Sequence, residues 1–78
     1  MASTVMTDTE ALNKIIDESG LKRKYLAEKL DLSAYGLLKK INNENEFRQS
    51  EIDALCKLLG ITSAKKRMDI FFKTKVDK

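Results

Sequence analysis

The sequence predicts an all-α fold, a compact domain of five short helices. Apolar residues recur at helical spacing in five separate stretches, and no stretch alternates apolar and polar residues as a strand does. The chain has no proline, and two of its three glycines directly follow apolar helical stretches, a typical position for a helix end. A chain of 78 residues has room for one small hydrophobic core.

The first helix is expected to begin at Thr7, which can cap it. Glu10 stands three residues later, the spacing of a capping box. Residues 12–16 provide an apolar stripe on one face of this helix. Gly20 then ends the helix in the left-handed conformation, and Leu21 is the apolar residue that often packs over such an end.

Two shorter helices follow, at about residues 22–30 and 34–42. Ser33 is a favourable cap for the second of them. Asn42 and Asn43 are expected to end it, because asparagine accepts left-handed backbone angles better than most residues.

This pair of helices, joined by a few residues, has the helix-turn-helix pattern. Ala27 in the first helix is small enough to let the second helix cross steeply. Gly36 is expected either to lie opposite Ala27 or to let its helix approach a phosphate. A steep crossing leaves the second helix projecting, so that it can enter a DNA major groove, which is about 12 Å wide.

A polar loop leads to the fourth helix, and Phe47 in this loop is expected to fill part of the core. Ser50 is the expected cap, with Asp53 three residues later, and Gly60 ends the helix. Cys56 lies on the apolar face and is interpreted as buried core rather than as a reactive thiol.

The fifth helix is expected to begin at Thr62 or Ser63. Its expected apolar positions are Ala64, Met68, Phe71 and Phe72. Adjacent residues diverge by about 100° on a helix, so one phenylalanine enters the core. The other lies at the core edge or forms a dimer contact.

Charge is unevenly distributed along the chain. Residues 21–43 hold six basic and two acidic residues, residues 61–78 have the same balance, and the remaining stretches are acidic. A basic block in a folded segment is either a phosphate-binding surface or an ordinary solvated helix face. We divide the chain into a disordered lead-in (1–6), a helix-turn-helix domain (7–73) and a basic tail (74–78).

Several classes of function are disfavoured. The chain has no histidine, and it lacks a phosphate-binding loop, so we expect no enzyme, no metal site and no cofactor. A single cysteine cannot form an internal disulfide, which favours a cytoplasmic location. The longest apolar runs are only a few residues, so we expect no membrane span.

Residues 12 to about 62 resemble the lambda-repressor-like (XRE/Cro-type) helix-turn-helix family, particularly its small phage or prophage regulators. The resemblance is carried by Gly20-Leu21, Leu26-Ala27-Glu28-Lys29-Leu30, Leu32-Ser33, Gly36-Leu37, Ile41-Asn42 and Leu58-Leu59-Gly60-Ile61. It implies a five-helix lambda-repressor-like DNA-binding domain whose second and third helices bind DNA.

The resemblance also implies a set of DNA-binding residues. They are Arg23, Ser33, Ala34, Tyr35, Leu38, Lys39, Asn42 and Asn43. Arg23 and Asn42 stand where the family contacts the DNA backbone, and Asn43 near the backbone or a base edge. Tyr35 is expected to bind a phosphate, to stack on a thymine methyl or to pack against a neighbouring leucine. Lys39 is preferred to Lys40 as a DNA contact.

Three features depart from the family pattern. Asp31 replaces the glycine common in the turn, at a cost of about 1 kcal/mol if its φ is positive. Leu38 is an apolar residue on the expected DNA face. Glu44 and Glu46 follow the third helix directly, where carboxylates would repel phosphates.

Two functions remain open. The first is a sequence-specific transcriptional regulator, a phage-type repressor that binds double-stranded DNA with its third helix, as a homodimer. The second is a protein-binding modulator or antirepressor that pairs with a separate repressor, using Leu38 and Tyr35 as an apolar anchor.

Overall fold

A computed structural model of the chain describes residues 5–74. The described residues form five helices and a pair of two-residue strands. These are β1 (Val5–Met6), α1 (Thr9–Ser19), α2 (Arg23–Lys29), α3 (Ala34–Ile41), α4 (Gln49–Leu59), α5 (Ala64–Phe71) and β2 (Lys73–Thr74). The predicted all-α, five-helix fold class is confirmed. Residues 1–4 of the predicted lead-in and 75–78 of the predicted tail lie outside the described residues.

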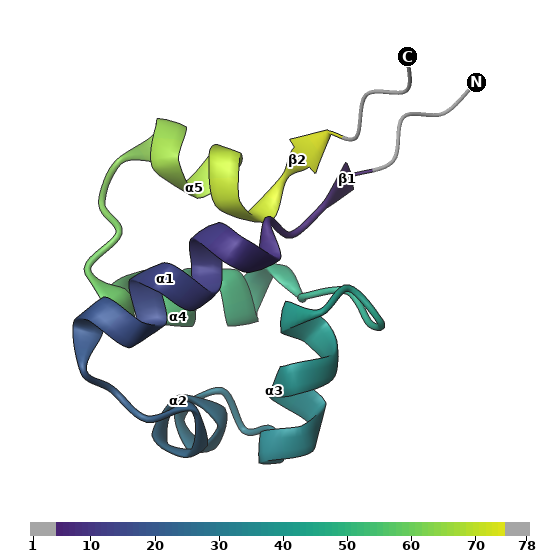
Figure 1. The fold of residues 1–78 in the computed structure, drawn as a ribbon, viewed down its shortest axis with the longest axis vertical. Coiled ribbons are helices and arrows are strands. Elements are labelled where there is room, and N and C mark those ends of the chain that lie inside the picture. The colour runs from purple at the N-terminus through teal and green to yellow at the C-terminus, as the bar shows by residue number, and fades with distance from the viewer. Residues whose placement is uncertain (1–4, 75–78) are drawn as a thin grey trace.

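The helices surround α1, which crosses the middle of the molecule in front of α4 (Figure 1). α1 packs against α3, α4 and α5, and α2 packs against α3 and α4. The core between them comprises Leu12, Ile16, Leu26, Ala27, Leu30, Leu37, Ile41, Ile52, Leu55, Cys56, Ile61, Ile70 and Phe71. This arrangement holds the α2–α3 pair at one end of the molecule, opposite α5 (Figure 1).

α1 begins later than the expected cap at Thr7. Asp8 is the N-cap, and its side chain accepts a hydrogen bond from the Ala11 amide at 3.2 Å. Thr7 is buried, and Glu10 is exposed in the first turn, so the predicted Thr7–Glu10 capping box is wrong. The backbone of Thr7 is hydrogen-bonded elsewhere, to Asn43, and Asp8 is an equally good capping residue.

The predicted glycine ends of α1 and α4 are confirmed. Gly20 and Gly60 have φ of 76° and 72°, a conformation that glycine adopts without steric cost. After Gly60, the Ile61 amide donates to the Cys56 carbonyl at 2.8 Å, and Ile61 is buried. α4 is therefore closed by Gly60 and the buried Ile61, whereas after Gly20 the Leu21 amide donates to the Ser19 hydroxyl at 3.1 Å and Leu21 packs partly buried against the core.

α4 begins two residues before the expected start, so Ser50 lies inside the helix and is not its cap. Arg48 is the N-cap, and its amide donates to the Glu51 carboxylate at 2.8 Å. An arginine side chain has no acceptor for the helix amides, so the first turn is held by Glu51 instead. Glu51 is itself paired with a residue of α3, so the side chain that holds the first turn of α4 also joins α4 to α3.

α5 starts after its Ser63 cap, one of the two expected caps, but its buried stripe differs from the expected one. Met68 is 55% exposed, whereas Ile70 is buried. Ile70 and Phe71 pack into the core and Arg67 pairs with Asp53 of α4 at 2.8 Å, which leaves Met68 on the solvent side of α5. The expected stripe was therefore wrong at Ala64 and Met68, which are both exposed, and it lacked Ile70.

The aromatic expectations for the core are confirmed. Phe47 packs from the loop against Phe71, with ring centroids 5.5 Å apart in an edge-to-face arrangement. Phe71 is buried, and Phe72 lies partly buried at the core edge. Cys56 is a buried free cysteine, as expected.

The short β1–β2 ribbon was not predicted. β1 and β2 are antiparallel, with Met6 opposite Lys73, and they bring the two ends of the described chain together (Figure 1). The Asp8 amide donates to the Ile70 carbonyl at 2.7 Å, which joins the start of α1 to α5. The start and end of the domain thus support each other.

Candidate nucleic-acid interface

The turn between α2 and α3 closes on Ala27, which is 1% exposed. The amides of Leu30 and Leu32 both donate to the Ala27 carbonyl, at 3.1 and 2.8 Å. Asp31 between them has φ of 61°, so the residue that replaces the usual glycine does adopt the left-handed conformation. Ala27 therefore lies buried where the two helices meet, as the motif requires.

Ser33 caps α3, as expected, and accepts a hydrogen bond from the Gly36 amide at 2.9 Å. A Cβ atom added to Gly36 would lie 3.1 Å from the Ser33 hydroxyl and within 4 Å of no atom of Ala27. The expectation that Gly36 lies opposite Ala27 is wrong. Close approach of Gly36 to a phosphate stays a prediction.

α3 divides into a buried face and an exposed face. Leu37 and Ile41 are fully buried, while Tyr35 is 67% and Leu38 45% exposed. Ala34 and Asn42, also in the predicted set, are exposed as well. Five of the eight predicted residues therefore line this face or its first turn, namely Ser33, Ala34, Tyr35, Leu38 and Asn42.

Lys39 lies partly buried beside this face. Its Nζ atom stands 5.4 Å from the centroid of the Tyr35 ring, a cation–π contact. Tyr35 therefore packs against Lys39 rather than being covered by Leu38 or Leu32. The lysine charge stays next to the exposed surface, where a phosphate can reach it.

α2 adds a second tyrosine–lysine pair that the sequence reading missed. Tyr25 is 40% exposed, and the Nζ atom of Lys29 lies 5.6 Å from its ring centroid. The pairs in α2 and α3 share the spacing Tyr-x-x-x-Lys, which places both side chains on one helix face. That repeated spacing is the signal that identifies Tyr25 from the sequence.

Arg23 at the start of α2 is engaged by α1. Its guanidinium donates to the Asn13 side-chain oxygen at 2.9 Å and pairs with Asp17 at 3.1 Å. The side chain is 37% exposed, so it is still accessible at the surface. Arg23 joins α2 to α1, and its expected contact with the DNA backbone stays a prediction.

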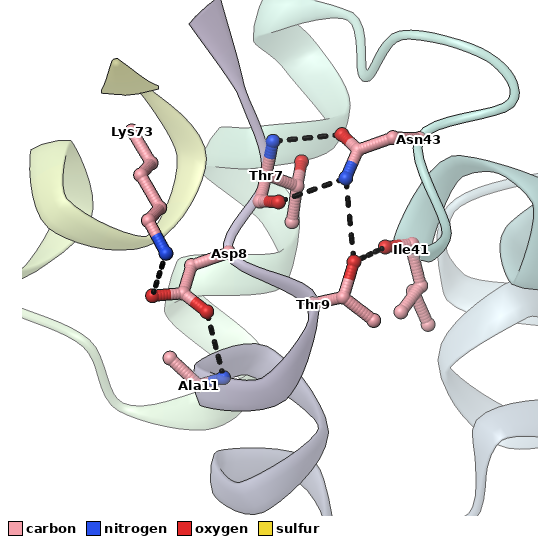
Figure 2. Close-up of polar contacts among 7 residues, drawn as sticks. All are labelled: Thr7, Asp8, Thr9, Ala11, Ile41, Asn43 and Lys73. Atoms are coloured by element: carbon pink, nitrogen blue, oxygen red, sulfur yellow. Dashed lines mark hydrogen bonds and ion pairs between the residues drawn. The ribbon is translucent and has the colours of Figure 1, made fainter. Parts of the chain in front are cut away.

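Asn43 holds the start of α1 against the end of α3 (Figure 2). Its side-chain oxygen accepts from the Thr7 amide at 2.8 Å, and its nitrogen donates to the Thr7 carbonyl at 2.9 Å and the Thr9 hydroxyl at 3.3 Å. Thr9 in turn donates to the Ile41 carbonyl at 2.6 Å. Sequence reasoning missed this role. Both amide hydrogens are used, so a base contact from this side chain would require breaking these bonds.

The α2–α3 pair and the helices that support it match a known protein family. The family described as the Cro/C1-type HTH DNA-binding domain matches residues 11–64, which include α2, α3 and α4 in full. The chain belongs to the Cro/C1-type HTH DNA-binding domain family. The predicted lambda-repressor-like resemblance is confirmed. No curated protein and no solved structure gives a significant match.

Within this HTH domain, Lys40 points away from the exposed face of α3. Its Nζ atom lies 2.6 Å from the Glu51 carboxylate, and the two side chains are only 11% and 9% exposed. Burial by itself raises the pKa of Glu51, but hydrogen bonds from the Arg48 amide and from Lys40, with the charges of Lys40 and Arg48, lower that pKa overall. The ion pair joins α3 to α4, so Lys40 helps to fix the orientation of α3 relative to α4.

Two carboxylates of the HTH domain follow α3 and are exposed, as the sequence indicated. Glu44 is held close to α3, because its amide donates to the Lys39 carbonyl at 2.8 Å. Glu46 lies two residues further along the loop.

None of the helices in residues 5–74 has the length and apolar character needed to cross a membrane.

Proposed function

We propose that this protein is a sequence-specific transcriptional regulator, a phage-type repressor that places α3 in the major groove of double-stranded DNA. The observation that supports this most directly is the exposed face of α3 in a Cro/C1-type HTH domain. A single helix fits the major groove, and α3 projects from the Ala27 crossing with that face open.

The proposal gives the residues distinct roles. Ala34, Tyr35 and Leu38 face the base edges, because they share the open side of α3. Ser33 and Asn42 stand at the two ends of the helix, where DNA backbones flank a helix in the groove. Lys39 neutralises a phosphate, together with Arg23 at the start of α2.

A homodimer is part of the proposal. One domain of this size contacts too little DNA for tight binding, and a two-fold pair would set two copies of α3 about 34 Å apart on successive turns of the duplex. The expected target is therefore a site with two-fold symmetry.

A titration of duplex DNA tests the proposal. Affinity should fall steeply between 50 and 200 mM salt, since each neutralised phosphate releases counterions, by about 10-fold or more for a few contacts. Lys39→Ala should weaken binding and flatten the salt dependence. Lys66→Ala on α5 is the matched control, because it removes the same charge from an exposed position outside α2 and α3. Salt-independent binding, or equal loss in both variants, would contradict the proposal.

A protein-binding modulator is the second candidate function. Tyr35 and Leu38 form an exposed apolar anchor, and Glu44 and Glu46 offer negative charge to a basic partner. Gel shifts with operator DNA, in the presence and absence of a separate repressor, distinguish the two functions. A modulator produces no shift alone and alters the shift of the repressor.

A further inference from the structure

The open face of α3 is chemically unusual for a surface that reads DNA. Its two most exposed large side chains are Tyr35 and Leu38, at 67% and 45%. Ala34 beside them is also apolar. The Ser33 hydroxyl is already used as the helix cap, and the Lys39 ammonium lies over the Tyr35 ring. The first two turns therefore offer an apolar surface where other readers of DNA offer paired hydrogen-bond donors.

Only one group on the base edges of the major groove matches such a surface. Guanine, cytosine and adenine present polar atoms there, whereas thymine adds a C5 methyl group to its acceptor. Covering a polar edge with Leu38 would strip water from it without replacing its hydrogen bonds, which is unfavourable. Covering a thymine methyl removes two apolar surfaces from water together.

We infer that Tyr35 and Leu38 determine specificity by contacting thymine methyl groups in the major groove. This inference rests on the proposed function and states what the same face recognises. Positive charge accompanies the apolar face, because the Lys39 ammonium lies 5.4 Å from the centroid of the Tyr35 ring. A basic group beside an apolar surface suits a methyl-bearing groove between two phosphate backbones better than it suits a purely apolar partner.

The cation–π contact contributes to this specificity. Lys39 lies on the Tyr35 ring and restricts its side chain, which has only two rotatable angles before the hydroxyl. A ring that is already oriented loses less conformational freedom on binding. Tyr35 and Lys39 thus act as a pair, in which the ring contacts the base and the ammonium remains close to the backbone.

The test begins with selection of duplexes from a random-sequence pool by the full chain. The selected duplex is then prepared with thymine or with deoxyuridine, which removes the C5 methyl and keeps every hydrogen-bonding atom. The deoxyuridine duplex should bind about fourfold more weakly for each methyl group that is lost from the contact, the factor that corresponds to burial of one such group. The doubly substituted Tyr35→Ala, Leu38→Ala chain should bind both duplexes equally.

Met68→Ala is the matched control, because it removes an exposed apolar side chain from α5, outside the α2–α3 pair. It should keep the full preference for thymine, and thermal unfolding should show that all variants fold. Equal binding of the thymine and deoxyuridine duplexes by the unmodified chain would overturn the inference and leave the proposed function standing. The same would follow if the doubly substituted chain kept the preference. Failure to select any duplex above the random pool would overturn the proposed function as well.

Discussion

Asp31 and Asn43 are the two non-glycine residues with positive φ in the part of the chain that the structure describes, at 61° and 66°. The two positions differ in what compensates the strain. Asn43 gains three side-chain hydrogen bonds from its position, whereas Asp31 is an exposed residue of the turn. Strain at Asp31 is therefore less compensated than strain at Asn43.

Asp31→Gly should increase the free energy of unfolding by up to about 1 kcal/mol, because glycine adopts this backbone conformation without a clash. Urea denaturation at pH 7 measures the change. Glu28→Gly, at an exposed position inside α2, is the control and should lower stability by about 1 kcal/mol. A loss of stability in both variants would show that the turn is not strained at Asp31.

Asn43→Gly should lower the free energy of unfolding by about 1–3 kcal/mol. Glycine keeps the left-handed backbone, so the loss reports the side-chain bonds to the backbone of Thr7, which is buried. Asn45→Gly in the same exposed loop is the control and should change stability by less than about 1 kcal/mol. Equal effects of the two substitutions would mean that the Asn43 contacts add nothing.

At the scale of the elements, the ion pair between Lys40 and Glu51 connects α3 to α4. The pKa of Glu51 in the folded protein lies below its ordinary value of 4.5. A lowered pKa means that the ionised carboxylate stabilises the folded state. This contribution is complete above pH 4.5 and is lost as the pH falls through the folded pKa.

Glu51→Gln should therefore reduce stability by about 2 kcal/mol at pH 7, and the difference from the unmodified protein should shrink below pH 4.5. Urea unfolding between pH 3 and pH 7 measures both effects. Glu46→Gln, at an exposed loop position, provides the reference for loss of a carboxylate without a buried partner. A difference that stayed constant with pH would contradict this account of Glu51.

At the scale of the whole molecule, the sequence predicts what depends on nearby residues. The apolar stripes and the glycines at 20 and 60 predicted the helices and two of their ends. The predictions that were wrong concern positions that depend on contacts between distant segments. Asn43 binds a residue 36 positions away, and Ile70 of α5 packs into the core while its carbonyl accepts from the distant Asp8 amide. No local pattern encodes either contact. The exposed face of α3 was therefore predictable from the sequence, whereas the contacts that hold α3 in place, such as those of Asn43 and Lys40, were not.

The distribution of charge over the whole molecule leads to the last prediction. Glu44 adds a negative charge just after the end of α3, where its amide is hydrogen-bonded to the Lys39 carbonyl at 2.8 Å. Glu44→Gln should therefore strengthen DNA binding at 50 mM salt by about two- to fivefold, because one repulsive charge is removed near the phosphates. The gain should decrease at 300 mM salt as the Debye length shortens.

Glu18→Gln near the end of α1 changes the net charge of the protein by the same amount at an exposed helical position, whereas Glu44 lies in the loop after α3. Comparing this variant with Glu44→Gln separates the effect of a charge near the bound DNA from the effect of net charge on affinity. If net charge alone controlled affinity, the two substitutions would act equally; a contact made by the end of α3 requires Glu44→Gln to have the larger effect. Fluorescence anisotropy titrations of one labelled duplex at both salt concentrations give the comparison. Equal effects would place the DNA away from the end of α3.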